Sequence, residues 1–129
     1  YYKNLLKKYI KLKMICTNPD LIVYRGLRSE YCAGSVAAIF RELGGKVIYF
    51  GKPYPEIYNF CIKKNETILA IGDNIRTDIK GANNMKFDSL FVTSGIHKSE
   101  FINLPFDDYD KILNKYNTKT NYYIEKLAW

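Results

Sequence analysis

The sequence has 129 residues, a formal net charge of +7 and 47% hydrophobic residues. This length allows one domain or parts of two, and the apolar content is enough for a core, which excludes a disordered chain. No apolar run approaches about 18 residues, so neither a membrane-spanning helix nor a membrane partner is expected. The first residues lack the pattern of a signal peptide. The chain does not begin with Met and opens on an expected helix with no element before it, which predicts a piece of a longer protein.

The cysteine and histidine content argues against disulfides and zinc. Cys16, Cys32 and Cys61 are widely spaced and odd in number, and no Cys-x-x-Cys pair occurs. His97 is the only histidine and cannot complete a Cys/His zinc site. We therefore expect reduced thiols, mostly packed as small apolar side chains, and a cytoplasmic location.

The positive charge is spread along the chain and forms one cluster near the amino terminus. Lysines between residues 3 and 13 are interleaved with leucine, isoleucine and tyrosine, which indicates an amphipathic helix with a solvated basic face. A basic nucleic-acid-binding domain is the alternative, and it predicts salt-dependent binding. Since no recognisable DNA- or RNA-binding motif supports that alternative, no nucleic-acid partner is expected.

The first part of the chain predicts short, irregularly spaced elements. Asn18 precedes Pro19 and is forced out of the helical region, so a loop follows the first strand. Ser35 is placed to cap a helix, and Gly44-Gly45 to end it in a left-handed turn. In chain order we expect a helix over 1–11, a strand at 13–16, a loop at 17–20, a strand at 21–24, an irregular segment with a glycine turn over 25–32, and a helix over about 35–43.

From residue 46 onward strands and helices alternate regularly. We expect strands at 46–50, 68–71, 89–92 and 122–124, and helices over about 55–64, 76–85 and 107–116. Such alternation predicts an α/β fold with a parallel sheet and crossover helices. We place a boundary near Gly44-Gly45, which divides the chain into residues 1–45 and 46–129.

The most informative stretch is the acidic loop after the strand expected at 68–71. The apolar run stops at a glycine, Asp73 follows at once, and Asp78 lies five residues later in the first turn of a helix. Ligands of open α/β sheets bind at the carboxyl ends of strands, so both carboxylates should face one crevice. Asn74 and Thr77 add oxygen atoms, and such an oxygen-rich site suits a hard cation such as Mg²⁺.

Lys52 is the second candidate for a functional residue. It follows the strand expected at 46–50 and lies between Gly51 and Pro53. An ammonium group at the carboxyl end of a strand is a point charge suited to a phosphate group. An exposed loop lysine is the plain alternative, and the acidic loop two elements later favours the functional interpretation.

Five short motifs carry a family resemblance. They are Thr-Asn-Pro-Asp at 17–20, Ala-Gly-Ser at 33–35, Gly-Lys-Pro-x-Pro at 51–55, Gly-Asp-Asn-x-x-Thr-Asp at 72–78 and Thr-Ser-Gly at 93–95. Together they resemble the haloacid dehalogenase (HAD) superfamily of hydrolases. Within it they are most similar to the class IIA branch, which contains nitrophenylphosphatase-like, pyridoxal-phosphatase-like and sugar-phosphate-phosphatase-like enzymes.

The resemblance implies a Rossmann-like parallel sheet as the core, with an α/β cap inserted into it. Residues 1–45 would then be the carboxyl-terminal part of the cap, and residues 46–129 the second half of the core. Asn18 and Asp20 would lie in the cap loop that faces the substrate, and that substrate would be a small phosphorylated metabolite.

The resemblance also implies roles for three residues in phosphomonoester hydrolysis through a phospho-aspartyl intermediate. Lys52 would steady the phosphate and the charge on the nucleophile. Asp73 would bind Mg²⁺, and Asp78 would support the metal directly or through water. Metal and lysine together would offset the charge on the transferred group, which is the main task in phosphoryl transfer.

The sequence departs from the family at the nucleophile. The family's nucleophile belongs to an Asp-x-Asp motif after an early strand, and no such motif precedes Lys52. The only Asp-x-Asp, at 108–110, has no strand before it. We therefore expect half of an active site, little or no activity of the chain alone, and a sheet with an unpaired edge.

Two alternatives remain open at this point. The chain could work with a complementing amino-terminal fragment or self-associate as a homo-oligomer. It could instead be a non-enzymatic remnant or a binding module for phosphate-bearing ligands.

Overall fold

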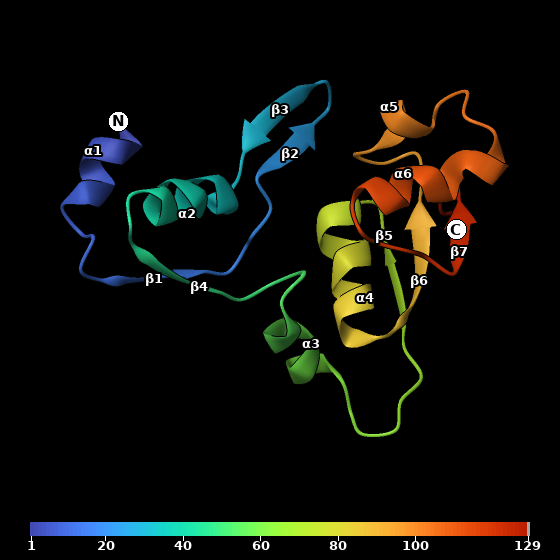
Figure 1. Cartoon of the computed structure of the whole chain (residues 1–129), viewed down its shortest axis with the longest axis horizontal. Coiled ribbons are helices and arrows are strands. Elements are labelled where there is room, and N and C mark those ends of the chain that lie inside the picture. Colours follow the sequence, from blue (N-terminus) through green and yellow to red (C-terminus); the bar gives the residue numbers. More distant parts are fainter. Residues whose placement is uncertain (129) are drawn as a thin grey trace. The chain divides into compact units, whose positions relative to one another are not determined.

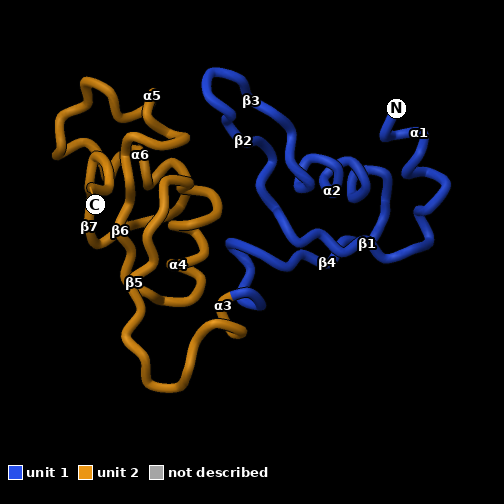
Figure 2. The backbone as a smooth tube through the Cα atoms, turned by 180° about the vertical axis from the view of Figure 1, so that it is seen from behind, with its two compact units in different colours: residues 1–57 blue, residues 58–129 orange. Residues whose placement is uncertain are grey.

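The structure is a computed structural model that describes residues 1–128, and it consists of two compact units, Tyr1–Ile57 and Tyr58–Trp129 (Figure 2). The first unit holds a parallel strand pair and an antiparallel hairpin, and the second holds a three-stranded parallel sheet. Parallel pairing in both units confirms the expected α/β class. None of the helices in the described residues has both the length and the apolar character needed to cross a lipid bilayer.

The first unit is built on two parallel strands and a helix packed against them. Its elements are α1 (Tyr2–Lys7), β1 (Lys13–Cys16), β2 (Ile22–Arg25), β3 (Arg28–Tyr31), α2 (Ala33–Glu42) and β4 (Lys46–Tyr49), with α3 (Pro55–Cys61) running across the division between units (Figure 1). β1 and β4 pair in parallel, with Met14 opposite Val47. Because α2 packs on α1 and on both strands, its Phe40 is almost completely buried.

The carboxyl-terminal end of α2 is the one that the sequence predicts, whereas its amino-terminal end differs from the prediction. Ser35 Oγ donates to the carbonyl of Leu21 (2.6 Å) and does not cap the helix. At the other end Gly44 has a φ of +90°, a left-handed conformation that glycine adopts without strain. A Cβ on Gly45 would lie 2.4 Å from the Phe40 ring. The glycine pair therefore both ends the helix and leaves room for its main core residue.

Two further expectations for this unit are wrong. The segment expected to be irregular, 25–32, contains β3, which pairs antiparallel with β2 through a turn at Gly26. All four β3 side chains are exposed, so the strand lacks the apolar alternation by which a half-buried strand is found in a sequence. The helix expected over 1–11 ends at Lys7.

The pairing of β4 also differs from the expected one. This strand was expected to open the sheet of residues 46–129, and it pairs with β1 of the first unit instead. Regular alternation along a chain predicts parallel strands, but it does not show which strand is the neighbour of which. The division of the chain into a cap over 1–45 and half of a core over 46–129 stays a prediction.

The second unit contains the expected parallel sheet. Its elements after α3 are β5 (Leu69–Gly72), η1 (Ile75–Ile79), α4 (Lys80–Met85), β6 (Asp88–Val92), α5 (Lys98–Phe101), η2 (Phe106–Asp108), α6 (Tyr109–Lys115) and β7 (Tyr122–Ile124). The strand order is β5-β6-β7, and all pairs are parallel (Figure 1). The π-helical turn η1 opens the helix expected over 76–85, and the four-residue α5 is too short to give a periodic signal.

One face of this sheet carries the core of the second unit. Ser89 and Phe91 of β6 are completely buried. The other members of the buried cluster around Phe91 are Ile75, Ile79, Phe101, Ile112 and Leu113. Within the described residues β5 has a neighbouring strand on one side only, as does β7. That an edge is unpaired because core strands are missing stays a prediction.

Phe91 should be a major contributor to stability. Replacing Phe91 by Ala should lower the free energy of unfolding by about 3–5 kcal/mol, because the fully buried ring would leave a cavity. Phe60→Ala is the matched control, since the Phe60 ring lies mostly in solvent and its loss should cost less than about 0.5 kcal/mol. Urea unfolding followed by circular dichroism measures both, and equal losses would contradict the assigned core.

Candidate functional site

Asp73 lies at the carboxyl end of β5, where a parallel strand delivers ligand-binding side chains. Its Oδ2 accepts a hydrogen bond from the backbone amide of Ile96 (2.9 Å), which belongs to the loop after β6. A Cβ on Gly95 would lie 2.0 Å from the same oxygen. The carboxylate is therefore packed directly on the backbone of the β6 loop, and only glycine leaves room for it.

Asp78 lies over the same strand end and is buried. Its Oδ2 accepts from the backbone amide of Asn74 (3.0 Å), and a Cβ on Gly72 would lie 2.2 Å from its Cγ. Burial and the nearby charge of Asp78 raise the pKa of Tyr58 above its usual range. The structure thus brings both predicted acids to the carboxyl end of β5.

The turn between the two acids adds further oxygen atoms. Asn74 Oδ1 accepts from the backbone amide of Arg76 (2.9 Å) and so caps η1. Thr77 Oγ1 is buried and has no hydrogen-bond partner among the described residues. Because an unsatisfied buried hydroxyl costs about 1–3 kcal/mol, a water or a ligand atom is expected to bind it.

These donors fit Mg²⁺ by their chemistry. Asp73 and Asp78 are hard oxygen ligands, and Mg²⁺ is commonly held by one or two carboxylates with waters and substrate phosphates completing its shell. Among residues 1–128 no group of three or more His, Cys, Asp or Glu side chains could hold a metal ion. Two carboxylates would leave most of the coordination shell of such an ion to water and substrate.

Lys52 and the loop at 17–20 lie together in the first unit. They follow the paired strands β4 and β1, and the backbone amide of Phe50 donates to the carbonyl of Cys16 (2.8 Å). A Cβ on Gly51 would lie 2.6 Å from Pro19 Cδ, so the two loops are in close contact. Lys52 itself is exposed.

The other two residues predicted for this loop have a local role. Asn18 Oδ1 accepts from the backbone amide of Asp20 (3.1 Å), which shapes the turn. Asp20 is half-buried. Their predicted position facing a substrate stays a prediction, as does the predicted pairing of Lys52 with Asp73, because the lysine and the acid belong to different units.

The sequence did not reveal a polar network beside the acidic loop. Nδ1 of His97 lies 2.5 Å from Glu100 Oε1, and the Tyr116 hydroxyl donates to Glu100 Oε2 (2.9 Å). The Arg76 guanidinium lies 4.8 Å from the centre of the Tyr116 ring, in cation–π geometry. Only the spacing of His97 and Glu100 is visible in the sequence. The network supports the segment that follows Ile96, whose amide holds Asp73.

The carboxylate of Glu100 is stabilised within this network. Burial raises the pKa of this carboxyl, but hydrogen bonds from His97 and Tyr116, with the charges of His97 and Arg76, lower it more. The net result is a pKa below the usual range. The hydrogen bonds to Glu100 are therefore stronger in its charged form.

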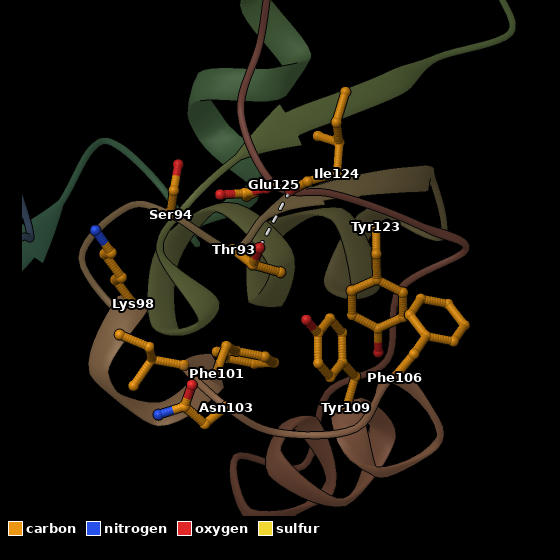
Figure 3. A pocket seen from close by; sticks show the side chains of 11 residues that line it. Thr93, Ser94, Lys98, Phe101, Asn103, Phe106, Tyr109, Tyr123, Ile124 and Glu125 are labelled. Carbon is orange, nitrogen blue, oxygen red and sulfur yellow. Dashed lines mark hydrogen bonds between the residues drawn. The ribbon is translucent and has the colours of Figure 1, made fainter.

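A cavity of about 350 Å³ opens at the carboxyl ends of β6 and β7 (Figure 3). The rings of Phe101, Phe106, Tyr109 and Tyr123 gather on one side of it. On the strand side Thr93 Oγ1 donates to the carbonyl of Ile124 (3.4 Å). Four of the eleven lining residues are aromatic, and the two acids of the β5 loop do not belong to the lining.

Comparison with known proteins identifies similar sequences. A model of the HAD-hydrolase-like family matches residues 49–128. Ribonucleotide monophosphatase NagD of Escherichia coli (strain K12) is 33% identical over 99 residues, which are 73% of this chain and 39% of NagD. Dihydroxyacetone phosphatase of Corynebacterium glutamicum (strain R) is 32% identical over 89 residues, which are 65% of this chain and 32% of that enzyme.

A solved structure resembles nearly all of the chain. A hydrolase of the haloacid dehalogenase-like family from Brucella suis 1330 superimposes with a TM-score of 0.77 and 29% sequence identity. The match covers 98% of this chain and 49% of that protein. The chain therefore spans about two fifths of NagD and half of this structural neighbour.

Gly95 should control the contact that holds Asp73. In Gly95→Ala the new methyl group would displace the carboxylate, so the Ile96 amide should lose a hydrogen bond worth about 1 kcal/mol and exchange its proton faster. Amide hydrogen exchange measured by NMR reports this directly. Ser94→Ala is the control and should leave the exchange of Ile96 unchanged, and an unchanged Ile96 amide in Gly95→Ala would contradict the packing.

Glu100 should make stability depend on pH in the acid range. Its pKa in the folded protein lies below the ordinary value of 4.5, so its stabilising effect is present above that pH and disappears as the pH falls through the folded-state pKa. The difference in free energy of unfolding between the unmodified chain and Glu100→Gln should therefore shrink on acidification. Urea unfolding from neutral to acid pH measures it, with the exposed Asp107→Asn as control. A difference that grows on acidification would contradict the direction of the shift.

Proposed function

This chain belongs to the HAD-hydrolase-like family, and we propose that it supplies the lysine and the acidic loop of a Mg²⁺-dependent phosphatase that hydrolyses phosphomonoesters. The observation that carries the proposal is the end of β5. There Asp73 is held by the Ile96 amide and Asp78 by the Asn74 amide. An oxygen-rich strand end of this kind suits a hard cation and a phosphate group.

We place the chain in the class IIA branch of the family. The relatives named above support this, since two of the similar proteins are called phosphatases of small phosphorylated compounds, a ribonucleotide and dihydroxyacetone phosphate. A small phosphorylated metabolite is accordingly the proposed substrate class. The relatives are much longer than this chain, so their activities are transferred to it only as part of the proposal.

Each candidate residue of this chain would have a separate role in phosphate hydrolysis. Asp73 and Asp78 would hold Mg²⁺, and the buried Thr77 hydroxyl lies in the same turn. When bound, the metal would offset negative charge on the transferred phosphoryl group. Lys52 would add a second positive charge at the phosphate, and Asn18 and Asp20 would face the organic part of the substrate.

The nucleophile is the missing part of this site. The chemistry proposed for the family needs a carboxylate that attacks phosphorus, and the chain has no Asp-x-Asp at the end of a strand. Its only Asp-x-Asp lies in η2 and α6, where Asp108 pairs with Lys111 (2.6 Å) and Asp110 accepts from the Tyr123 hydroxyl. We therefore propose that the chain alone has little activity and that a complementing polypeptide or another copy would have to supply the nucleophile.

We propose that the protein lies in the cytoplasm, because its free cysteines indicate a reducing compartment. Cys16, Cys32 and Cys61 are all free in the structure. Cys16 is buried, Cys32 is half-buried and Cys61 is exposed, so the expectation that the thiols are mostly packed in the core is wrong. Exposed thiols persist mainly where the surroundings keep them reduced.

The metal role of Asp73 can be tested on the chain as it exists. Isothermal titration calorimetry with Mg²⁺ should show weak binding, because two carboxylates leave much of the metal's shell to water. Asp73→Asn should abolish this binding, whereas the exposed Asp107→Asn should not change it. Binding that survives in Asp73→Asn would contradict the assigned site, and tight binding by the unmodified chain would contradict its being half a site.

A further inference from the structure

The cavity at the carboxyl ends of β6 and β7 has the size of a small-molecule site (Figure 3). Its volume of about 350 Å³ lies within the range of ligand pockets, which is about 300–1,000 Å³. All of its lining residues belong to the second unit. Because neither Asp73 nor Asp78 lines it, the proposed metal site does not account for this cavity.

Aromatic rings form one end of the cavity in a fixed arrangement. The Tyr109 ring lies edge-on to the rings of Phe101 and Tyr123, at centre-to-centre distances of 5.1 and 5.3 Å. Phe106 packs on Tyr109 and Tyr123 at 5.3 and 5.6 Å. The Tyr123 hydroxyl donates to Asp110 Oδ1, which fixes the orientation of that ring. Since the rings hold one another, these walls are formed before a ligand binds, and they suit a flat aromatic group.

Two apolar side chains of the lining are open to water. Phe106 is 67% and Ile102 60% exposed, although the Phe101 ring in the same lining is buried. Removing apolar surface from water is favourable. An aromatic ligand in the cavity would therefore gain binding energy from both exposed side chains.

The other end of the cavity carries polar side chains. Figure 3 shows Ser94, Lys98 and Glu125 on the side away from Phe106. Among residues 1–128, none of these three side chains forms a hydrogen bond or an ion pair. Lys98 and Glu125 thus have opposite charges and are not paired with each other. A ligand with both an anionic and a cationic group can use both charges, whereas a ligand with a single charge is attracted by one and repelled by the other.

We propose that this cavity binds a small aromatic zwitterion, namely a free aromatic amino acid. The ring of the amino acid lies against Phe106 and Tyr109, its carboxylate accepts from Lys98, and its ammonium group donates to Glu125. An amino acid inside a peptide chain carries neither of these backbone charges, so the ligand is the free compound. The inference goes beyond the proposed function and does not rest on it.

Isothermal titration calorimetry of the full chain with L-phenylalanine tests the site. We expect saturable one-to-one binding with a dissociation constant of about 1 mM or lower, as for other ligands of this size. Phenylpropionate lacks the ammonium group and phenylethylamine lacks the carboxylate, so each should bind about fivefold more weakly. Equal binding of all three compounds, or no saturable binding of L-phenylalanine, would overturn the proposal.

Variants of the two charged residues should each remove one part of this selectivity. Lys98→Met should weaken L-phenylalanine about fivefold and should not weaken phenylethylamine, which has no carboxylate. Glu125→Gln should weaken L-phenylalanine about fivefold and should not weaken phenylpropionate, which has no ammonium group. Lys115→Met is the matched control, because Lys115 is exposed and lies outside the lining. An equal loss for all three compounds in either cavity variant would show a merely structural role and overturn the assignment.

The ring at the rim provides an independent test. Phe106→Ala should weaken L-phenylalanine about fivefold, because it removes one aromatic wall. Phe60→Ala is the matched control, since Phe60 is 82% exposed, belongs to the same unit and lies outside the lining. Because both rings lie mostly in solvent, both variants should fold, and circular dichroism checks this. Equal affinities of the two variants would contradict the proposed position of the ligand.

An NMR titration locates the bound amino acid without any substitution. The amide signals of Ser94, Lys98 and Phe106 should shift on addition of L-phenylalanine, with the affinity that calorimetry gives. Shifts confined to residues outside the lining would overturn the proposal.

This proposal and the proposed function can fail separately. L-phenylalanine binding without Mg²⁺ binding that depends on Asp73 would support the cavity as a site and contradict the proposed function. Mg²⁺ binding that depends on Asp73, without binding of L-phenylalanine, would support the metal site and overturn the amino-acid site.

Discussion

The hydrogen bond from the Ile96 amide to Asp73 is the constraint on which the acidic site depends. It joins the loops that follow β5 and β6, and it forms only because Gly95 has no Cβ that would collide with the carboxylate. Gly72 has the same role toward Asp78. Carboxylates at a packed strand end are costly unless they are hydrogen-bonded. The Ile96 and Asn74 amides each satisfy one oxygen, so two acids can share this strand end.

The three-stranded sheet that positions Asp73 and Asp78 has an edge strand, β5, directly before these acids. Parallel strands collect functional groups at one edge, and their chemistry therefore depends on which strands are neighbours. In the second unit β5 has a neighbour on one side only within the described residues. The apolar side chains of Leu69 and Ile71 on this edge strand are about half exposed.

The sequence predicts what is local in this protein. The acidic loop, the lysine loop and the glycine end of α2 follow from short motifs, because each is determined by residues near one another in the chain. The pairing of β4 with β1 joins strands about thirty residues apart, and no local pattern encodes it. The strand at Arg28–Tyr31 was missed because its exposed side chains carry no alternation. The contact of Glu100 with Tyr116 likewise depends on tertiary packing and not on spacing.

The loops that carry Lys52 and Asp73 are each held by contacts within one unit. Lys52 follows Gly51, which packs on Pro19 within the first unit, and Asp73 is held by Ile96 within the second. Each loop is therefore ordered by contacts inside its own unit and needs no help from a nucleophile strand. Catalytic groups on such supported elements keep their geometry when another part of the site is absent. The acidic loop and the lysine loop can for this reason each keep their geometry within their own unit.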